Sequence, residues 1–436
     1  MGSVRFVTFG CKANQYDTQV LREALARRGW REEEWEADLV VVNTCTVTAE
    51  AGRKARKLIR RVVRERPDTK VCVTGCLAES EPEVLRELPG VEWVLGNGDA
   101  RRPLNFLRQL GHDIDPEELG IPAGITAFAG HTRAFLKIQD GCDRSCSFCI
   151  IPRVRGKSRS RPTLELAQEV RDLVQAGHVE VVLCGIHIGH WGRELGLELA
   201  DLLAVLMEVE PRSAEGEPLA YRLRLSSIEA TEVSPRLLEL MATRPERLAP
   251  HLHMPLQSGD DEILAAMNRW YRMDEYLAAC DRIRSALDRP AFTADALVGF
   301  PGEGERQFAN TLQAVREVGF SRVHVFPFSP RPQTAAWEMG PAVAPEQVRE
   351  RRALLSEVAG EASDAWRRTL TGAAELVVVE GLGGLGGRYQ RVRLDPEGFP
   401  GSPSGLVHVR LAVRDADEDE GVELVGHPLA SAGDAP

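Results

Sequence analysis

The chain has 436 residues, of which 43% are hydrophobic and 27% charged, and its formal net charge is −11. This length exceeds what one ordinary core supports, so two or three domains are expected. The longest apolar runs, such as DLVVV and VEVVLC, suit buried strands and are far too short for a membrane span. The N-terminus shows no charged leader followed by a long apolar core, so we expect a cytoplasmic protein with no membrane partner.

The first third of the chain alternates strand-like and helix-like segments. Strand patterns occupy 4–10, 38–44, 70–75 and 91–96, and helical patterns occupy 17–30, 51–66 and 81–88. Such alternation predicts a parallel sheet with helices on its faces. We expect this domain to cover residues 1–112. A Gly- and Pro-rich stretch without periodicity then predicts a linker over residues 113–132.

A second alternating series occupies residues 133–370. Its strand candidates are 134–139, 180–184, 222–227, 251–255, 292–298 and 322–326, and a long helical pattern over 344–370 closes it. Six parallel βα units predict a full or partial barrel with its chemistry at the carboxyl ends of the strands.

The tail over 371–430 consists of β-type segments between Gly-rich turns, which predicts a small all-β barrel. The run GLGGLGG fits the spacing G-x-G-x-x-G at Gly381, Gly383 and Gly386, but a dinucleotide site needs a helix after the glycines and a strand pattern follows here. We therefore expect a flexible turn, and a disordered end over 429–436.

Nine cysteines in a reducing compartment point to metal or redox chemistry. Cys142, Cys146 and Cys149 form a CxxxCxxC loop directly after the first barrel strand. Three thiolates can bind three irons of a cubane [4Fe–4S] cluster and leave the fourth iron open. A structural zinc would need a fourth protein ligand, and the nearest candidates, His131 and Cys184, are not at the usual spacing.

Three other cysteines, Cys11, Cys45 and Cys76, each follow the carboxyl end of a predicted strand in residues 1–112. Because parallel strands align these ends at one sheet edge, the three thiols can converge on a second metal site. Cys72 lies within a strand pattern and Cys280 within a helical one, so both are expected to be buried and apolar in character.

These motifs resemble known families. The CxxxCxxC loop with Phe148 before its last cysteine resembles the radical S-adenosylmethionine (SAM) superfamily. The segments FGCKANQYDTQ, VVNTCTVTAEA and VTGCLAE resemble the N-terminal domain of methylthiotransferases. Within that family, GCKANQYDT and LRLSSIEA resemble the group that acts on N6-threonylcarbamoyladenosine in tRNA.

The resemblance implies an α/β chain of three parts. They are an N-terminal parallel-sheet α/β domain that holds an auxiliary cluster, a partial (β/α)6 TIM-like radical SAM barrel, and a small C-terminal TRAM barrel of OB-like type. It also implies two [4Fe–4S] clusters and SAM as cofactors. The implied metal ligands are Cys11, Cys45, Cys76, Cys142, Cys146 and Cys149, and the implied SAM contacts are Gly185, Ser226, Glu229, Gln257, Gly299 and Gly302. No catalytic side chain is identified.

The implied activity is insertion of a methylthio group at C2 of N6-threonylcarbamoyladenosine 37, next to the tRNA anticodon. The partners would be the anticodon stem-loop and a reductase or flavodoxin-type electron donor. Basic residues over 53–64 and 153–161 are candidate RNA contacts, whereas RDADEDEGVE makes the tail acidic. Three alternatives stay open: isopentenyladenosine in tRNA, an aspartate of a ribosomal protein, or a non-enzymatic, metal-stabilised RNA-binding protein.

Overall fold

The computed structural model describes residues 2–100, 102–113, 115, 124–340, 343–399, 403–415 and 422–429. Much of the expected linker over 113–132, part of the acidic segment and nearly all of the expected disordered end lie outside the described residues. Within the described part of the chain, no helix is both long and apolar enough to cross a membrane.

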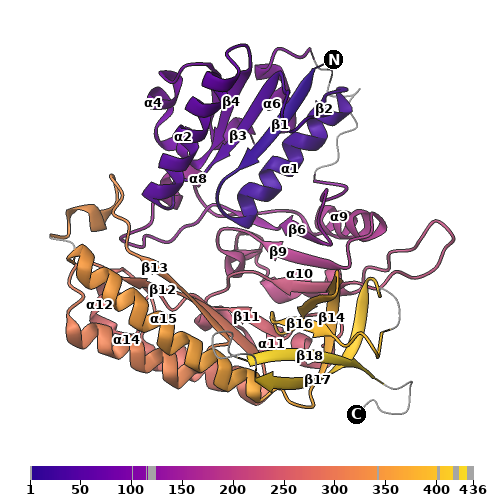
Figure 1. Cartoon of the computed structure of the whole chain (residues 1–436), viewed down its shortest axis with the longest axis vertical. Helices are drawn as coiled ribbons and strands as arrows, with labels where there is room; N and C mark the ends of the chain where they lie inside the picture. Colours follow the sequence, from indigo (N-terminus) through magenta and orange to yellow (C-terminus); the bar gives the residue numbers. More distant parts are fainter. Residues whose placement is uncertain are drawn as a thin grey trace.

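The N-terminal part is a five-stranded parallel sheet in the order β2-β1-β3-β4-β5 (Figure 1). Its strands are β1 (Ser3–Thr8), β2 (Arg31–Glu32), β3 (Leu39–Thr44), β4 (Lys70–Gly75) and β5 (Val91–Leu95), and its helices are α1 (Lys12–Arg27), α2 (Ala49–Glu65), α3 (Cys76–Ser80), α4 (Pro82–Arg86), α5 (Asn97–Ala100) and α6 (Pro103–Gln109). One face packs on α1 and α6 through residues such as Leu25 and Phe106, and the other packs on α2 and α4 through Ile59 and Leu85.

The middle part is a partial barrel of six parallel strands in two hydrogen-bonded sheets, β10-β9-β6 and β11-β12-β13. The strands are β6 (Arg133–Lys137), β9 (Glu180–Cys184), β10 (Arg222–Leu225), β11 (His251–His253), β12 (Ala291–Val298) and β13 (Arg322–Pro327). Isolated parallel bridges, such as that between Ser227 and His253, connect the two sheets. All six strands correspond to the predicted ones.

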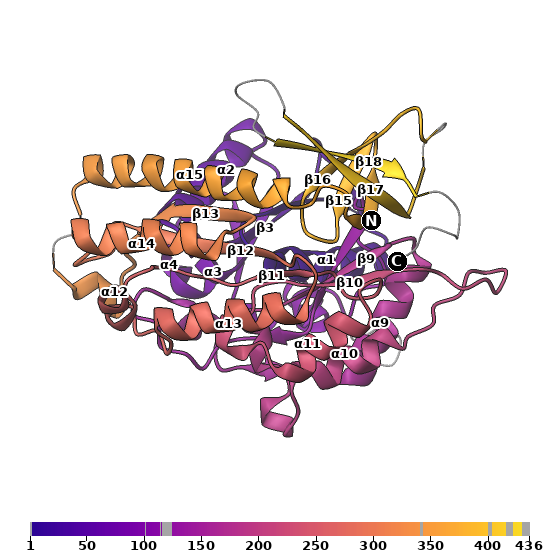
Figure 2. The same ribbon diagram turned by 90° about the horizontal axis from the view of Figure 1, so that it is seen from below.

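Helices cover the outside of this barrel, as seen in Figure 2. They are α9 (Thr163–Gln175), α10 (Leu199–Met207), α11 (Pro235–Thr243), α12 (Asp261–Ala266), α13 (Met273–Ala286), α14 (Glu305–Val318) and the long α15 (Pro345–Arg368). The cysteine loop follows the short β7 (Gln139–Asp140), and α8 (Ile151–Arg155) and β8 (Arg159–Ser160) come after it. Buried apolar side chains from strands and helices form one continuous core.

The C-terminal part is a closed barrel with the strand order β14-β15-β16-β18-β17. The strands are β14 (Ala374–Glu380), β15 (Gly383–Gly386), β16 (Arg391–Leu394), β17 (Leu406–Asp415) and β18 (Val422–Pro428). The α/β fold class with a small all-β barrel is therefore confirmed.

The glycine-rich run is not the flexible turn that we expected, because Gly383–Gly386 form strand β15. A Cβ atom on Gly384 would lie 2.1 Å from the carbonyl oxygen of Val378, and one on Gly383 would lie 2.7 Å from that of Val392. The glycines are needed because neighbouring backbones approach too closely for a side chain.

This small barrel is attached to the amino ends of the middle strands by buried charges. Glu180 accepts hydrogen bonds from the guanidinium groups of Arg222 and Arg224. The remaining N–H groups of Arg224 donate to the carbonyls of Gly386 and Gly387, at 2.9 and 2.7 Å, while Arg222 donates to carbonyls of β14 and β15. The carboxyl ends of the middle strands thus stay available for a site.

Candidate functional site

Cys11, Cys45 and Cys76, called here the N-terminal trio, follow β1, β3 and β4 at one edge of the first sheet. Gly10 has a φ of +106°, and a Cβ there would lie 3.0 Å from the sulfur of Cys45. The turn before Cys11 therefore lies directly against Cys45. The three cysteines therefore converge at one edge of the sheet, as expected.

Asn14, in the first turn of α1, connects all three strand ends. Its amide nitrogen donates to the carbonyls of Phe9 and Thr44, at 2.8 and 2.9 Å, and its amide oxygen lies 4.0 Å from the sulfur of Cys76. Asn14 is buried, so these contacts fix the geometry of the trio.

Cys142, Cys146 and Cys149, called here the loop trio, follow β7 at the carboxyl end of the middle barrel. The amide of Cys149 donates to the carbonyl of Cys146 at 3.1 Å, which folds the loop back on itself. The ring nitrogen Nδ1 of His187 lies 3.7 Å from the sulfur of Cys142, and Arg269 donates to the sulfur of Cys146 at 3.6 Å. Polar side chains therefore face two of the three sulfurs.

The two trios are neighbours because α8 joins them. Ile150 and Val154 pack against Cys76 in a small apolar cluster. The side chain of Asn97 donates to the carbonyl of Val154 at 2.7 Å, which fastens α8 to the first sheet. Residues that directly follow Cys149 thus touch the N-terminal trio.

The sulfur donors and the charges beside them fit an iron–sulfur cluster. Burial raises the pKa of Cys45 to about 11 and that of Cys149 to about 12. Such thiols stay protonated at neutral pH unless a metal displaces the proton. Three sulfur donors at each place, with a guanidinium beside Cys76 and another beside Cys146, match a cluster of net negative charge held by three cysteines.

A cavity of about 250 Å³ lies between the two trios. Its walls include Val47, Thr48, Phe148, Cys149, Gln257, Asp295, Phe326, Phe328 and Arg331. Val47 donates its amide to the sulfur of Cys45 at 3.4 Å, so the cavity reaches from the residues after Cys45 to Cys149. A reactant held there would lie against Cys149 and against the segment that follows Cys45.

The six residues expected to contact SAM have different surroundings in the structure. Gln257, with a φ of +60°, lines the cavity. Glu229 is buried and forms an ion pair with Arg269, the residue that also contacts Cys146. Gly185 packs on the backbone of Gln139, because a Cβ there would lie 2.8 Å from its carbonyl oxygen.

The other three lie at the ends of β10 and β12. Ser226 is buried directly after β10. Gly299 and Gly302 have positive φ values of 82° and 87° in the turn after β12. A Cβ on Gly299 would meet Val348 of α15 at 2.6 Å, so this glycine is required for packing on that helix.

Several polar residues near the trios escaped the sequence reasoning: Asn14, Asp17, Asp140, Arg155, His187 and Arg269. Their partners lie up to 141 residues away along the chain, so no local pattern reveals them. Asn14 and Asp17 do lie within the segment FGCKANQYDTQ, and Arg155 lies within the basic run over 153–161.

His187, His190 and Glu232 form a tight group beside Cys142. The two imidazole rings are stacked 3.7 Å apart, and Arg144 and Arg193 both donate to Glu232, at 3.3 and 2.9 Å. Two guanidinium groups on the only carboxylate disfavour a cation, so this group supports the loop trio by hydrogen bonding.

The two expected basic patches differ in the structure. On α2, all but one of the basic residues over 53–64 are exposed. In the second patch, Arg155 is buried, and Arg161 turns inward to donate to Glu169 at 2.7 Å. Arg155 and Arg161 therefore do not belong to the expected basic patch on the surface, because their side chains pair with the buried carboxylates of Asp140 and Glu169. Arg153, Lys157 and Arg159 remain exposed.

Comparison with known proteins agrees with this geometry. Residues 136–315 match a sequence model described as the Radical SAM superfamily, and residues 3–96 match one described as Uncharacterized protein family UPF0004. The threonylcarbamoyladenosine tRNA methylthiotransferase MtaB of Bacillus subtilis is 38% identical over 354 residues, which cover 78% of this chain and 76% of that protein. The chain belongs to the radical SAM methylthiotransferase family. The tRNA-2-methylthio-N(6)-dimethylallyladenosine synthase of Paracoccus denitrificans, another relative, is 35% identical over 80% of each chain.

As a radical SAM methylthiotransferase, the chain is an enzyme that transfers a methylthio group, and SAM and an iron–sulfur cluster are its cofactors. The solved structure of TsrM from Kitasatospora setae, a radical SAM methyltransferase with cobalamin and a [4Fe-4S] cluster bound, is similar with a TM-score of 0.55 over 77% of each chain at 16% identity. This likeness shows a shared fold. The predicted family is confirmed, and a non-enzymatic RNA-binding protein is excluded.

Proposed function

We propose that this enzyme inserts a methylthio group at C2 of N6-threonylcarbamoyladenosine 37 in tRNA, next to the anticodon. The observation that carries the proposal is the cavity between two cysteine trios, in a chain 38% identical to a relative named for this nucleoside. In this proposal the loop trio holds the radical SAM [4Fe–4S] cluster and the N-terminal trio holds a second, auxiliary one. The division into domains over 1–112, 133–370 and 371–430 is part of it.

The residues of the chain would hold and orient the reactants. When bound, the cofactors supply an electron and the radical chemistry at the C2–H bond, and the protein supplies positioning and exclusion of water. Phe148, Phe326 and Phe328 give the cavity apolar and aromatic walls, which suit a stacked adenine base. Gln257 and Asp295 offer polar groups that can orient the base.

One cavity residue supports the threonylcarbamoyl substrate over isopentenyladenosine. Arg331 is only 8% exposed, and its Nη2 has no hydrogen-bond partner among the described residues. A buried N–H group without a partner is costly, and a carboxylate would satisfy it. The threonylcarbamoyl group carries a carboxylate, whereas the dimethylallyl group is neutral.

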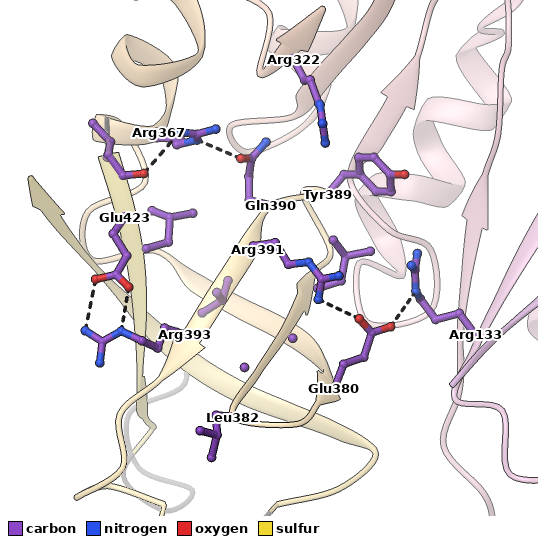
Figure 3. A pocket seen from close by; sticks show the side chains of 16 residues that line it. Arg133, Arg322, Arg367, Glu380, Leu382, Tyr389, Gln390, Arg391, Arg393 and Glu423 are labelled. Carbon is purple, nitrogen blue, oxygen red and sulfur yellow. Dashed lines mark hydrogen bonds and ion pairs between the residues drawn. The ribbon is translucent and has the colours of Figure 1, made fainter. Parts of the chain in front are cut away.

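A second surface supports RNA as the substrate. A groove of about 800 Å³ lies where the small barrel meets the middle strands, and its walls carry five arginines, Arg133, Arg322, Arg367, Arg391 and Arg393 (Figure 3). Four of these arginines have a carboxylate partner: Glu380 pairs with Arg391 and Arg133, Glu423 pairs with Arg393, and Asp364 pairs with Arg367. Five arginines and two glutamates line the groove, so its walls are basic in a chain of net charge −11.

The groove and the cavity lie along the same edge strand. Arg322 begins β13 and Phe326 lies near its end, so the two sites are separated by about 13 Å at roughly 3.3 Å per residue. Phosphates that flank the modified nucleotide can then occupy the groove while the base enters the cavity.

The test uses anaerobically reconstituted full-length enzyme with SAM and a flavodoxin-type reductant. It is offered anticodon stem-loops that carry either threonylcarbamoyladenosine or isopentenyladenosine, and in a third reaction ribosomal protein. Mass spectrometry should show a methylthio group on the threonylcarbamoyl nucleoside. Modification of only the isopentenyl nucleoside or only the ribosomal protein would overturn the proposal.

A further inference from the structure

The side chain of Arg155 lies between the two trios. It ends α8, six residues after Cys149, and is only 2% exposed. An arginine buried to this degree needs several hydrogen-bond acceptors, since an unpaired buried charge is strongly unfavourable. Its contacts therefore show what it is placed to do.

Each nitrogen of the Arg155 guanidinium faces a different partner. Nε donates to the sulfur of Cys76 at 3.4 Å. Nη1 donates to both carboxylate oxygens of Asp140, at 3.0 and 3.2 Å, and Nη2 donates to Asp17 at 3.1 Å and to the side-chain oxygen of Asn14.

These partners belong to the two trios. Asn14 and Asp17 lie in α1, which starts directly after Cys11, whereas Asp140 lies two residues before Cys142. One side chain therefore joins the element after the first ligand of the N-terminal trio, the third ligand itself, and the residue that leads into the loop trio.

We propose that Arg155 is a positioning residue of the auxiliary cluster: it donates an N–H···S hydrogen bond to the Cys76 ligand and fixes the separation between the two metal sites. The inference rests on the proposed function, since it requires a cluster at the N-terminal trio. Hydrogen bonds to ligating sulfurs raise the reduction potential of iron–sulfur clusters, because they stabilise the more negative, reduced state.

Only the planar guanidinium group of arginine can make all of these hydrogen bonds at once. Lysine carries the same charge but is a single point donor on a flexible stem, so it can pair with Asp17 and Asp140 without also reaching the sulfur. Arg155→Lys thus keeps the buried charge and removes the N–H···S bond. Arg155→Gln removes the charge as well and would leave two buried carboxylates with fewer cationic partners.

The experiment compares wild type, Arg155→Lys and Arg155→Gln with Arg153→Lys as the matched control, since Arg153 lies on α8 but is exposed. Iron is counted on anaerobically reconstituted full-length protein. The auxiliary cluster is then titrated by electron paramagnetic resonance in a Cys146→Ala background, which removes the radical SAM cluster. A third measurement uses the enzymes that retain Cys146. It is the ratio of methylthiolated product to 5′-deoxyadenosine released.

Arg155→Lys should retain iron, shift the auxiliary potential to more negative values, and lower the product ratio at least tenfold while SAM cleavage continues. The Arg153→Lys control should match wild type. Wild-type potential and wild-type product ratio in Arg155→Lys would overturn the inference. Loss of folded structure in both Arg155 variants would also overturn it, because the residue would then be merely structural. Absence of a second cluster from the wild type would instead refute the proposed function.

Discussion

Glu180 offers a sharp test of how the small barrel is held in place. It is fully buried at the start of β9 and accepts hydrogen bonds from Arg222 and Arg224, which in turn donate to carbonyls of the small barrel. Glu180→Gln keeps the size of the side chain but removes the carboxylate that the two buried guanidinium groups share. The attachment of the small barrel should therefore weaken.

The size of the effect follows from two separate arguments. Burial alone would raise the pKa of Glu180, but Arg224 and Arg222 outweigh it and lower the pKa from 4.5 to about 2. A difference of this size corresponds to about 3 kcal/mol at roughly 1.4 kcal/mol per pKa unit. Removal of one partner from a buried ion pair costs about 3–5 kcal/mol, which agrees.

The direction in which this stabilisation changes with pH follows from the lowered pKa of Glu180. The stabilisation is fully present above pH 4.5 and is lost as the pH falls toward 2, because the folded state must then take up a proton that the unfolded state already holds. Wild type should therefore lose attachment of the small barrel in this acid range, whereas Glu180→Gln should already be weakened at pH 7.

Hydrogen exchange of the amides in residues 383–389 measures the attachment directly. A loss of about 3 kcal/mol should speed their exchange by about 100-fold at pH 7. The matched control is Glu380→Gln, because Glu380 pairs with Arg133 and Arg391 at a partly exposed site and should matter by at most about 1 kcal/mol. Equal effects of the two substitutions, or no effect of Glu180→Gln, would refute the reasoning.

Three further predictions concern the metal sites, the cavity and the groove. Cys146→Ala should halve the bound iron and abolish release of 5′-deoxyadenosine, and full iron content in elemental analysis would contradict this. Arg331→Gln should raise KM for the threonylcarbamoyl stem-loop at least tenfold while binding of unmodified RNA is retained; an unchanged KM would exclude a carboxylate contact. Replacement of Arg391 and Arg393 by Gln should lower the slope of log affinity against log salt by about one unit per arginine, and equal slopes would show that the groove makes no phosphate contacts.

The barrel strands could be predicted because buried parallel strands are short apolar runs between helical patterns. The same rule failed for β15. Glycines have low strand propensity, so GLGGLGG resembles a turn; its strand conformation depends on the close approach of β14 and β16, which only the folded barrel provides. Cys72 and Cys280 are fully buried, as their positions within a strand and a helix predicted.

Arg155 shows why the candidate site could be predicted only in part. The cysteines are recognisable because their spacing and their positions after strands are local features. Arg155 lies in a run of basic residues and resembles part of an exposed patch, but its partners Asn14 and Asp17 are 141 and 138 residues away. A contact across that separation depends on the packing of α8 against α3 and α5 of the first domain, and the sequence carries no local sign of it.

The same packing bears on the proposed function, which requires both trios to act at one cavity. Each trio follows the carboxyl ends of strands. A contact between the two domains is therefore needed to fix the distance between the trios. Here α8 follows the loop of one trio and packs on Cys76 of the other, so the distance is set by the short continuous segment from Cys149 to Arg155. A substitution that loosens α8 should therefore uncouple radical formation from sulfur transfer before it abolishes either one.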